Sequence, residues 1–187
     1  MQPILVAYGS TDGQTRKIAE FIAQRLRIRG HRVDLIDTST PAAQQVPPLY
    51  QGAIVGGSVH QHRHQRALVH FLKNNRAWLA SMPVALFSVS LAAALDDMDS
   101  RLEAQRLLDE LTDDCGLLPI ARRCIAGALK YTQYDYLTRQ VMRLIARQRG
   151  QATDTSADAE YTDWNDIEAF VDEYLATAGI AGPAKAA

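Results

Sequence analysis

A short apolar run near the start of the chain leads directly into a loop of small polar residues. Residues 3–8, Pro-Ile-Leu-Val-Ala-Tyr, read as a buried strand, and residues 9–15 follow as Gly-Ser-Thr-Asp-Gly-Gln-Thr. The next residues have the spacing of an amphipathic helix. Free amides in such a loop, together with the positive end of a helix dipole, favour a dianionic phosphate. The stretch therefore predicts a phosphate cradle, with a plain helix N-terminus after a buried strand as the simpler alternative.

The spacing of the loop excludes two common nucleotide-binding motifs. It matches neither Gly-x-Gly-x-x-Gly, the dinucleotide fingerprint, nor Gly-x-x-x-x-Gly-Lys-Ser/Thr, the loop that holds nucleoside triphosphates. Both motifs are therefore poor matches to this loop.

Strands and helices alternate along the rest of the chain. Apolar periodicity predicts helices over residues 14–29 and 65–79, a third in which Ala104, Leu107, Leu108 and Leu111 share one face, and a last one capped by Thr162 or Asp163. Strands are expected at residues 3–8, 31–37, 52–57, 83–89 and 124–129. This alternation is typical of an α/β fold with a parallel sheet and right-handed crossovers.

The first loop resembles the Ser/Thr-x-Thr-Gly-x-Thr pattern with which the flavodoxin-like family holds the phosphate of FMN. Asp12 departs from that pattern, and the run Asp-Gly-Gln-Thr at residues 12–15 resembles the flavodoxin-like protoporphyrinogen IX dehydrogenases, which deliver electrons to quinone. Ala-Gly-Ala-Leu-Lys-Tyr at residues 126–131 and Tyr-Thr-Asp-Trp at residues 161–164 are similar to motifs of the same subfamily. The resemblance implies a doubly wound five-stranded parallel sheet of order 2-1-3-4-5, in one FMN-binding domain over residues 1–178 with a flexible tail at 179–187.

In that fold the ligand lies where three loops meet at the carboxyl ends of the strands. The phosphate is expected to contact backbone amides and hydroxyls of the first loop, with Asp12 pointing away or capping the helix and Arg16 offsetting some of the charge. The second loop (57–64) and the third (88–95) are expected along the flavin ring. The cofactor-binding residues expected are Ser10, Thr11, Asp12, Gly13, Gln14, Thr15, Ser58, Val59, His60, Ser88, Val89, Ser90 and Leu91.

The second and third loops contain no Trp, Tyr or Phe. A ring without stacked aromatic side chains keeps one face open to a bulky substrate, which favours an enzyme over an electron shuttle. His60, His62 and Arg63 are candidates to orient the propionates of a tetrapyrrole or to stabilise the reduced flavin. His60, His62 and His64 alternate, and alternate residues of an extended strand share a face, so a metal site is an alternative. No carboxylate or cysteine accompanies them in the loop, so we expect no metal; solvated loop histidines are the remaining interpretation.

Residues 130–158 form an insertion that a minimal flavodoxin lacks. Arg139, Arg143 and Arg147 recur every fourth residue beside an apolar face, and residues 130–149 carry five basic side chains against one acidic. A basic amphipathic helix of this kind suits an anionic membrane surface, although the apolar face could instead cover the helix's own domain. No apolar run reaches the ~18 residues needed to span a bilayer.

By the resemblance, the chain oxidises protoporphyrinogen IX to protoporphyrin IX in haem biosynthesis, with menaquinone or ubiquinone as acceptor, in the cytoplasm at the inner face of the cell membrane. The alternatives are a flavodoxin-type electron carrier and an NAD(P)H:quinone reductase. Ordinary flavodoxins are strongly acidic, which fits poorly with a formal net charge of −1. That charge gives no reason to expect nucleic acid. Cys115 and Cys124 lack the spacing of a metal or redox pair, and both are expected to be reduced and structural.

Overall fold

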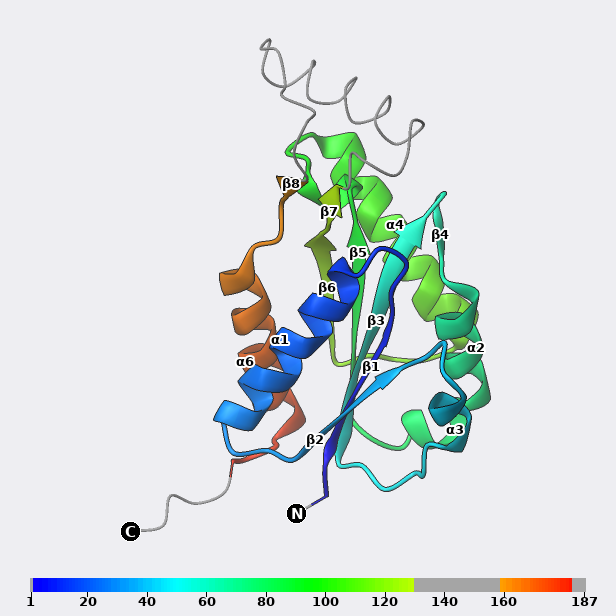
Figure 1. The fold of residues 1–187 in the computed structure, drawn as a ribbon, viewed down its shortest axis with the longest axis vertical. Coiled ribbons are helices and arrows are strands. Elements are labelled where there is room, and N and C mark those ends of the chain that lie inside the picture. The colour runs from blue at the N-terminus through cyan, green and yellow to red at the C-terminus, as the bar shows by residue number, and fades with distance from the viewer. Residues whose placement is uncertain (1, 130–158, 183–187) are drawn as a thin grey trace.

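A central parallel sheet organises the computed structural model, which describes residues 2–129 and 159–182. The strands lie in the order β2-β1-β3-β5-β6, and each neighbouring pair is parallel (Figure 1). Numbered among themselves along the chain, they have the expected order 2-1-3-4-5. Their bounds are β1 Ile4–Gly9, β2 Val33–Asp37, β3 Gly52–His60, β5 Val84–Ser90 and β6 Ala121–Ala126.

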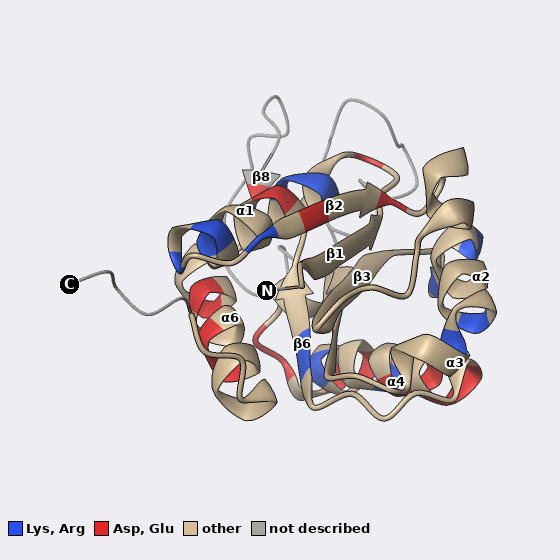
Figure 2. Ribbon diagram, turned by 90° about the horizontal axis from the view of Figure 1, so that it is seen from below, with Lys and Arg blue, Asp and Glu red and all other residues tan. Residues whose placement is uncertain are grey.

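Helices cover both faces of this sheet. Figure 2, which looks along the sheet, shows α1 (Gln14–Ile28) and α6 (Trp164–Ala178) on one side. On the other side lie α2 (Arg66–Asn74), α3 (Arg76–Leu79) and α4 (Met98–Cys115). Two short 3₁₀ helices occupy connections, η1 (Pro41–Gln45) and η2 (Ala92–Ala94).

Each face of the sheet has its own apolar layer. In β1, Ile4 and Val6 pack toward α1 and α6, whereas Leu5 and Ala7 pack toward α2 and α4, and all four are fully buried. A strand with helices on both faces has no solvent side, so its sequence is apolar throughout. This accounts for the continuous apolar run at the start of the chain.

The helix predicted over residues 65–79 is divided in two at Asn75. Its side-chain amide donates to the Phe71 carbonyl over 2.8 Å, and its side-chain oxygen accepts from Trp78 Nε1 over 2.8 Å. A short amide side chain that binds nearby backbone competes with the helical ladder. The apolar spacing continues across the break, so periodicity alone did not reveal it.

The strand predicted at residues 124–129 is also corrected. β6 starts three residues earlier, at Ala121, and ends before Gly127. Its polar start has a structural reason: Arg122 pairs with Asp109 of α4 over 2.5 Å, and Arg123 pairs with Asp166 of α6 over 2.9 Å. Beyond Gly127, β7 (Ala128–Leu129) pairs with β8 (Ala159–Glu160) in a separate antiparallel sheet.

The last helix, α6, ends at a glycine in the left-handed conformation. Gly179 has a φ of 63°, and the amide of Ile180 donates to the Leu175 carbonyl over 3.2 Å. Ile180 is partly buried against the core, so the first part of the predicted tail is in contact with the domain. The remaining tail residues, 183–187, lie outside the described residues, and the domain limits stay a prediction.

Candidate functional site

The carboxyl ends of the central strands meet at one edge of the sheet. The register pairs Gly9 with Gly57, Ser58 with Val89, and Ser90 with Ala126. The first and second predicted loops are also joined by side chains: Thr11 Oγ1 lies 3.3 Å from Ser58 Oγ and accepts from Gln65 Nε2 over 2.6 Å. The structure therefore brings the predicted loop residues together at the switch point of the sheet, where ligands bind in such folds.

The first loop has the geometry of an anion cradle. Gly13, at φ 90°, turns the chain into α1, and its amide donates to Ser10 Oγ over 3.0 Å. The first helical bond joins Lys17 N to Gly13 O over 3.1 Å, so the amides of the preceding helical residues, 14–16, have no acceptor within the helix. Among the described residues no side chain caps α1, and its first turn holds no acidic residue. These features fit a dianionic phosphate.

The structure also tests the roles predicted for Asp12 and Arg16 beside the cradle. Asp12 does not cap the helix, because Gly13 holds the N-cap position and no side chain accepts from the first turn. Arg16 pairs with Glu20, one turn further along the same face, over 2.8 Å. Its charge is therefore already balanced locally, which leaves the backbone amides as the main anion donors of the loop.

Residues 57–64, expected as a loop, form a β-hairpin instead. β3 continues to His60, and β4 (Arg63–His64) returns antiparallel, with Val59 paired to His64 and His60 to Arg63. Gln61 and His62 form the tip, and both have positive φ values, 50° and 59°. Such two-residue turns normally carry Gly or Asn. This turn has neither residue, so the sequence did not predict a hairpin.

The alternating histidines of the hairpin do not act as one group. His64 Nε2 lies 2.9 Å from Ser88 Oγ on β5, and burial lowers the pKa of the His64 imidazole to about 4. His62, at the tip, is exposed and its Nδ1 lies 2.9 Å from Glu103 Oε1 of α4. Within the described ranges no group of three or more metal-ligating side chains is placed to hold an ion.

Glu103 and Arg106, which sequence reasoning missed, fix the tip of the hairpin. Arg106 donates to both oxygens of Glu103, over 2.8 and 2.9 Å. Hydrogen bonds from Arg106 first, and then from His62, lower the pKa of the Glu103 carboxyl to about 2. The carboxylate is therefore ionised throughout the neutral range. The pair follows the i, i+3 spacing of many helix ion pairs, so nothing in the sequence tied it to the site.

The start of the third predicted loop (88–95) lies inside β5, which ends at Ser90. Ser88 and Val89 are buried, and Val89 packs in the apolar layer beneath α1. Ser90 Oγ accepts from the amide of Ala93 over 3.2 Å, and Leu91 precedes η2. A ligand at this edge would meet backbone groups and the half-buried Leu91 rather than the side chains of the strand.

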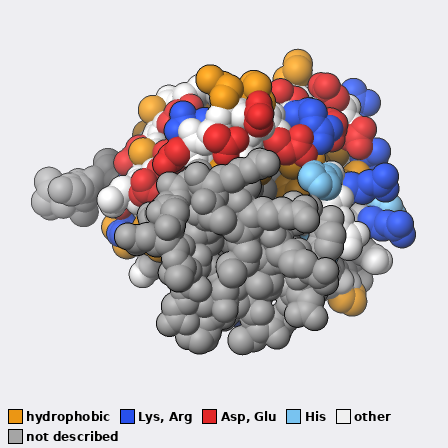
Figure 3. All heavy atoms as spheres, turned by 90° about the horizontal axis from the view of Figure 1, so that it is seen from above, with side chains coloured by type: hydrophobic (Ala, Val, Ile, Leu, Met, Phe, Trp, Pro, Cys, Tyr) orange, Lys and Arg blue, Asp and Glu red, His pale blue; other side chains and the backbone are white. Residues whose placement is uncertain are grey.

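Two hollows adjoin the hairpin. One, of about 560 Å³, reaches from the cradle residue Thr11 to His60, Arg63 and Arg66, and the other, of about 470 Å³, lies between the hairpin and α4. Figure 3, seen from this end of the sheet, shows His, Lys and Arg side chains gathered at the edge where the hairpin and α2 lie. Arg63 and Arg66 are exposed and make no ion pair with any residue that the structure describes.

The segment that follows the predicted insertion lies beside the cradle. Thr162 Oγ1 accepts from Gln14 Nε2 over 2.9 Å and donates to the Ala126 carbonyl over 2.8 Å. Lys17 reaches Glu160 over 3.4 Å. The start of α1 thus holds the segment that follows the predicted insertion, a link that only the fold reveals.

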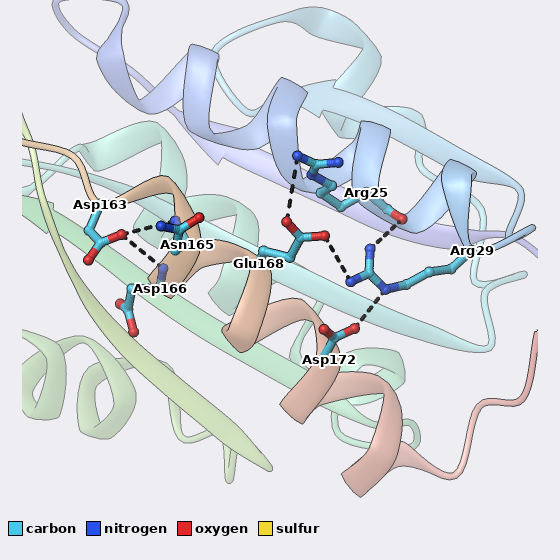
Figure 4. A network of polar contacts seen from close by, with 7 residues as sticks. All are labelled: Arg25, Arg29, Asp163, Asn165, Asp166, Glu168 and Asp172. Carbon is cyan, nitrogen blue, oxygen red and sulfur yellow. Dashed lines mark hydrogen bonds and ion pairs between the residues drawn. The ribbon is translucent and has the colours of Figure 1, made fainter.

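The helix after this segment is fixed to α1 by charge. Asp163, one of the two predicted caps, accepts from the amides of Asn165 and Asp166. Further along α6, Glu168 and Asp172 bind Arg25 and Arg29 of α1 (Figure 4).

Some predicted features fall on residues that the structure does not describe. Arg139, Arg143 and Arg147 lie outside the described residues, as does the whole of the insertion, 130–158. Among the helices that are described, none combines the length and the hydropathy that a crossing of the bilayer requires.

Comparison with known proteins extends this picture. The family model for the flavodoxin domain matches residues 5–156. Protoporphyrinogen IX dehydrogenase [quinone] from Escherichia coli K12 is 29% identical over 169 residues, which cover 90% of this chain and 92% of that protein. The Leishmania major protein of the same name is 27% identical, over 92% of this chain and 74% of its own. Oxidised flavodoxin 1 from Bacillus cereus superposes with a TM-score of 0.55 at 16% identity, over 93% of this chain and 97% of that one.

Proposed function

Because the chain belongs to the flavodoxin domain family, we propose that it is an FMN-dependent enzyme that oxidises protoporphyrinogen IX to protoporphyrin IX with a membrane quinone as electron acceptor. The observation that carries this proposal is the similarity, along nine-tenths of the chain, to proteins named as quinone-dependent dehydrogenases of that substrate. Its place would be in haem biosynthesis, at the cytoplasmic face of the cell membrane.

The cradle is the proposed site of the FMN phosphate. The amides of residues 14–16, which have no acceptor within α1, are the proposed donors, and the hydroxyl of Thr11 would add a further hydrogen bond. Backbone groups of residues 58–60 and 88–91 would meet the ring. When bound, FMN supplies the acceptor for the electrons that leave the substrate, and the protein sets which donor reaches it.

The substrate would approach from the side of the hairpin. The hairpin and residues 88–95 contain no Trp, Tyr or Phe to cover the ring, so a planar tetrapyrrole would have room beside it. The guanidinium of Arg63, which pairs with no carboxylate among the described residues, and the exposed imidazole of His62 are the proposed partners of its propionates. An arginine suits this task because its fork of N–H groups matches a carboxylate.

The direct test is porphyrin fluorescence followed over time under anaerobic conditions. The FMN-loaded protein receives protoporphyrinogen IX with a menaquinone analogue, beside a reaction without quinone. Quinone-dependent formation of porphyrin in excess over the enzyme would support the proposal. FMN binding without turnover would instead favour an electron carrier, and rapid reduction of the flavin by NAD(P)H would favour a nicotinamide-driven quinone reductase.

The role of Arg63 has its own test in the same assay. Arg63→Gln removes a charged donor, and a hydrogen bond to a charged group contributes about 1.5–3 kcal/mol, so KM for protoporphyrinogen IX is expected to rise on the order of tenfold or more. Arg32→Gln, which removes an equally exposed charge elsewhere, is the matched control. An unchanged KM in Arg63→Gln would exclude the residue from substrate binding.

The insertion is proposed as a membrane contact through Arg139, Arg143 and Arg147. Replacing the three together by glutamine should lower both liposome binding and quinone-coupled turnover, while the bound FMN content stays the same. Liposome binding that does not change would rule out docking by the insertion.

A further inference from the structure

The charged residues of the chain are distributed very unevenly. The protein has 21 acidic side chains, yet none lies between Asp37 and Asp96. Arginine and lysine do occur there, and they are concentrated in the hairpin, α2 and α3. Figure 2 shows the consequence in space, since α2 carries blue segments and no red ones. One side of the molecule is therefore basic although the whole chain is nearly neutral.

The basic residues of α2 form its outermost line. Arg66, His70 and Lys73 follow an i, i+4, i+7 spacing and are exposed, so they share one face of the helix. Leu68, Phe71 and Leu72 point the opposite way and are buried. Arg63 of the hairpin and Arg76 of α3 flank this line, and we refer to these five residues as the basic ridge.

The ridge is not neutralised by the part of the protein that the structure describes. Arg63, Arg66 and Lys73 have no ion pair or hydrogen bond there, and Arg76 Nε donates to a neutral group, the Gly116 carbonyl, over 3.1 Å. Outside the ridge most basic side chains of the described residues do pair with a carboxylate, and Arg27 and Arg32 are the exceptions. Basic side chains that pair with a carboxylate are Arg16, Lys17, Arg25, Arg29, Arg101, Arg106, Arg122 and Arg123.

We propose that the basic ridge is an interaction surface for an anionic lipid bilayer. The exposed cations Arg63, Arg66, Lys73 and Arg76 form a row that can touch a plane along its length, whereas a pocket would suit a small ligand. Each such cation near an anionic leaflet strengthens binding by electrostatic attraction. The side chain of Leu118, 95% exposed, follows two residues after the carbonyl that Arg76 binds, which provides an apolar side chain close to the end of the ridge.

This surface differs from the insertion and joins the site at one end. Arg63 and Arg66 line the hollow beside the cradle, so contact along the ridge would hold that edge of the sheet near the lipid. The choice of a bilayer rests on the proposed function in one respect, since a membrane quinone is the acceptor proposed there. The binding itself requires neither substrate nor turnover.

The test is co-sedimentation of the full-length, FMN-loaded protein with vesicles of phosphatidylcholine, with and without phosphatidylglycerol. The wild type is expected to bind only the vesicles that contain phosphatidylglycerol, and to release them as salt rises. Arg66→Gln/Lys73→Gln should weaken the partition coefficient at least tenfold, because two surface cations are lost. The control is Arg32→Gln/Arg101→Gln, which changes net charge equally on other faces.

The outcomes separate the alternatives. Weakening in the ridge variant, but not in the control, supports the proposal. If phosphatidylglycerol does not increase vesicle binding by the wild type, the proposal is wrong, and an acidic protein becomes the better partner for the ridge. Equal weakening in both variants, or an effect confined to the glutamine substitutions of Arg139, Arg143 and Arg147, would also overturn it. Circular dichroism and bound FMN verify that each variant is folded.

Discussion

His64 is a histidine that the fold keeps neutral. Its imidazole lies 2.9 Å from Ser88 Oγ on β5, and burial lowers its pKa to about 4, below the ordinary value of 6.5. The unfolded chain therefore binds a proton at a pH where the folded chain does not, and stability falls as pH drops below 6.5. The loss continues until the folded-state pKa is passed. Between those two values His64 is a specific source of acid sensitivity.

His64→Gln should remove much of that sensitivity while keeping a polar group beside Ser88. Linkage gives a loss of about 2 kcal/mol for the wild type between pH 7 and pH 5, and the variant should lack this component. Urea denaturation at the two pH values measures it. Glu103 does not interfere with this measurement. Its pKa is lowered from 4.5 to about 2, so the stability that it contributes is lost only as the pH falls below about 4.5. Parallel pH profiles for wild type and variant would contradict the assignment.

Gly13 is required by its backbone conformation rather than by space. Its φ is 90°, and a Cβ placed there would have no neighbour within 4 Å. Gly13→Ala should therefore cost about 1 kcal/mol of unfolding free energy from backbone strain alone. Gly13→Asn should cost less, because asparagine tolerates left-handed conformations better. Chemical denaturation of both variants measures the difference, and an equal cost for the two would point to some other cause.

At the scale of elements, sequence reasoning predicted what the apolar pattern controls. The strands and the main helices follow from buried runs and helical spacing, whereas the order of the strands came from the resemblance to the flavodoxin-like family. The errors lie where side-chain bonds decide the structure. Asn75 breaks a helix that keeps its apolar spacing. Arg122 and Arg123 can lie in a strand because each forms an ion pair with a carboxylate of a neighbouring helix. Such long-range pairs leave no local pattern to read.

The link between the start of α1 and the segment before α6 is an example of such a contact. Thr162 Oγ1 bonds both Gln14 and the Ala126 carbonyl, and the threonine is only partly exposed. Thr162→Val would leave two polar groups without this partner, at a cost of about 1–3 kcal/mol. Thr162→Ser keeps the hydroxyl and should recover most of the loss. Urea denaturation compares the two, and equal stability of both variants would show that the bond contributes little.

At the scale of the whole molecule, the site depends on where separate elements end. The sequence indicated the cradle because its residues are contiguous, and the structure places them at the end of α1 with uncapped amides. It did not indicate the tether of the hairpin to Glu103, because that contact joins residues that only the fold brings together, and it did not indicate the hairpin, whose turn lacks Gly and Asn. The proposed FMN site can therefore be tested on the molecule as a whole, through the coupling of ligand binding to unfolding.

A ligand that binds only the folded state raises the free energy of unfolding by about 2.7 kcal/mol at a hundredfold excess over its Kd. For a domain of this size that corresponds to a rise in Tm of about 5–10 °C. If the amides at the start of α1 hold the phosphate, FMN should give this rise, whereas riboflavin, which has the same ring and no phosphate, should give much less at equal concentration. Calorimetry of the apoprotein with each ligand makes the comparison. Equal shifts would mean that the ring alone drives binding and that the cradle has another role.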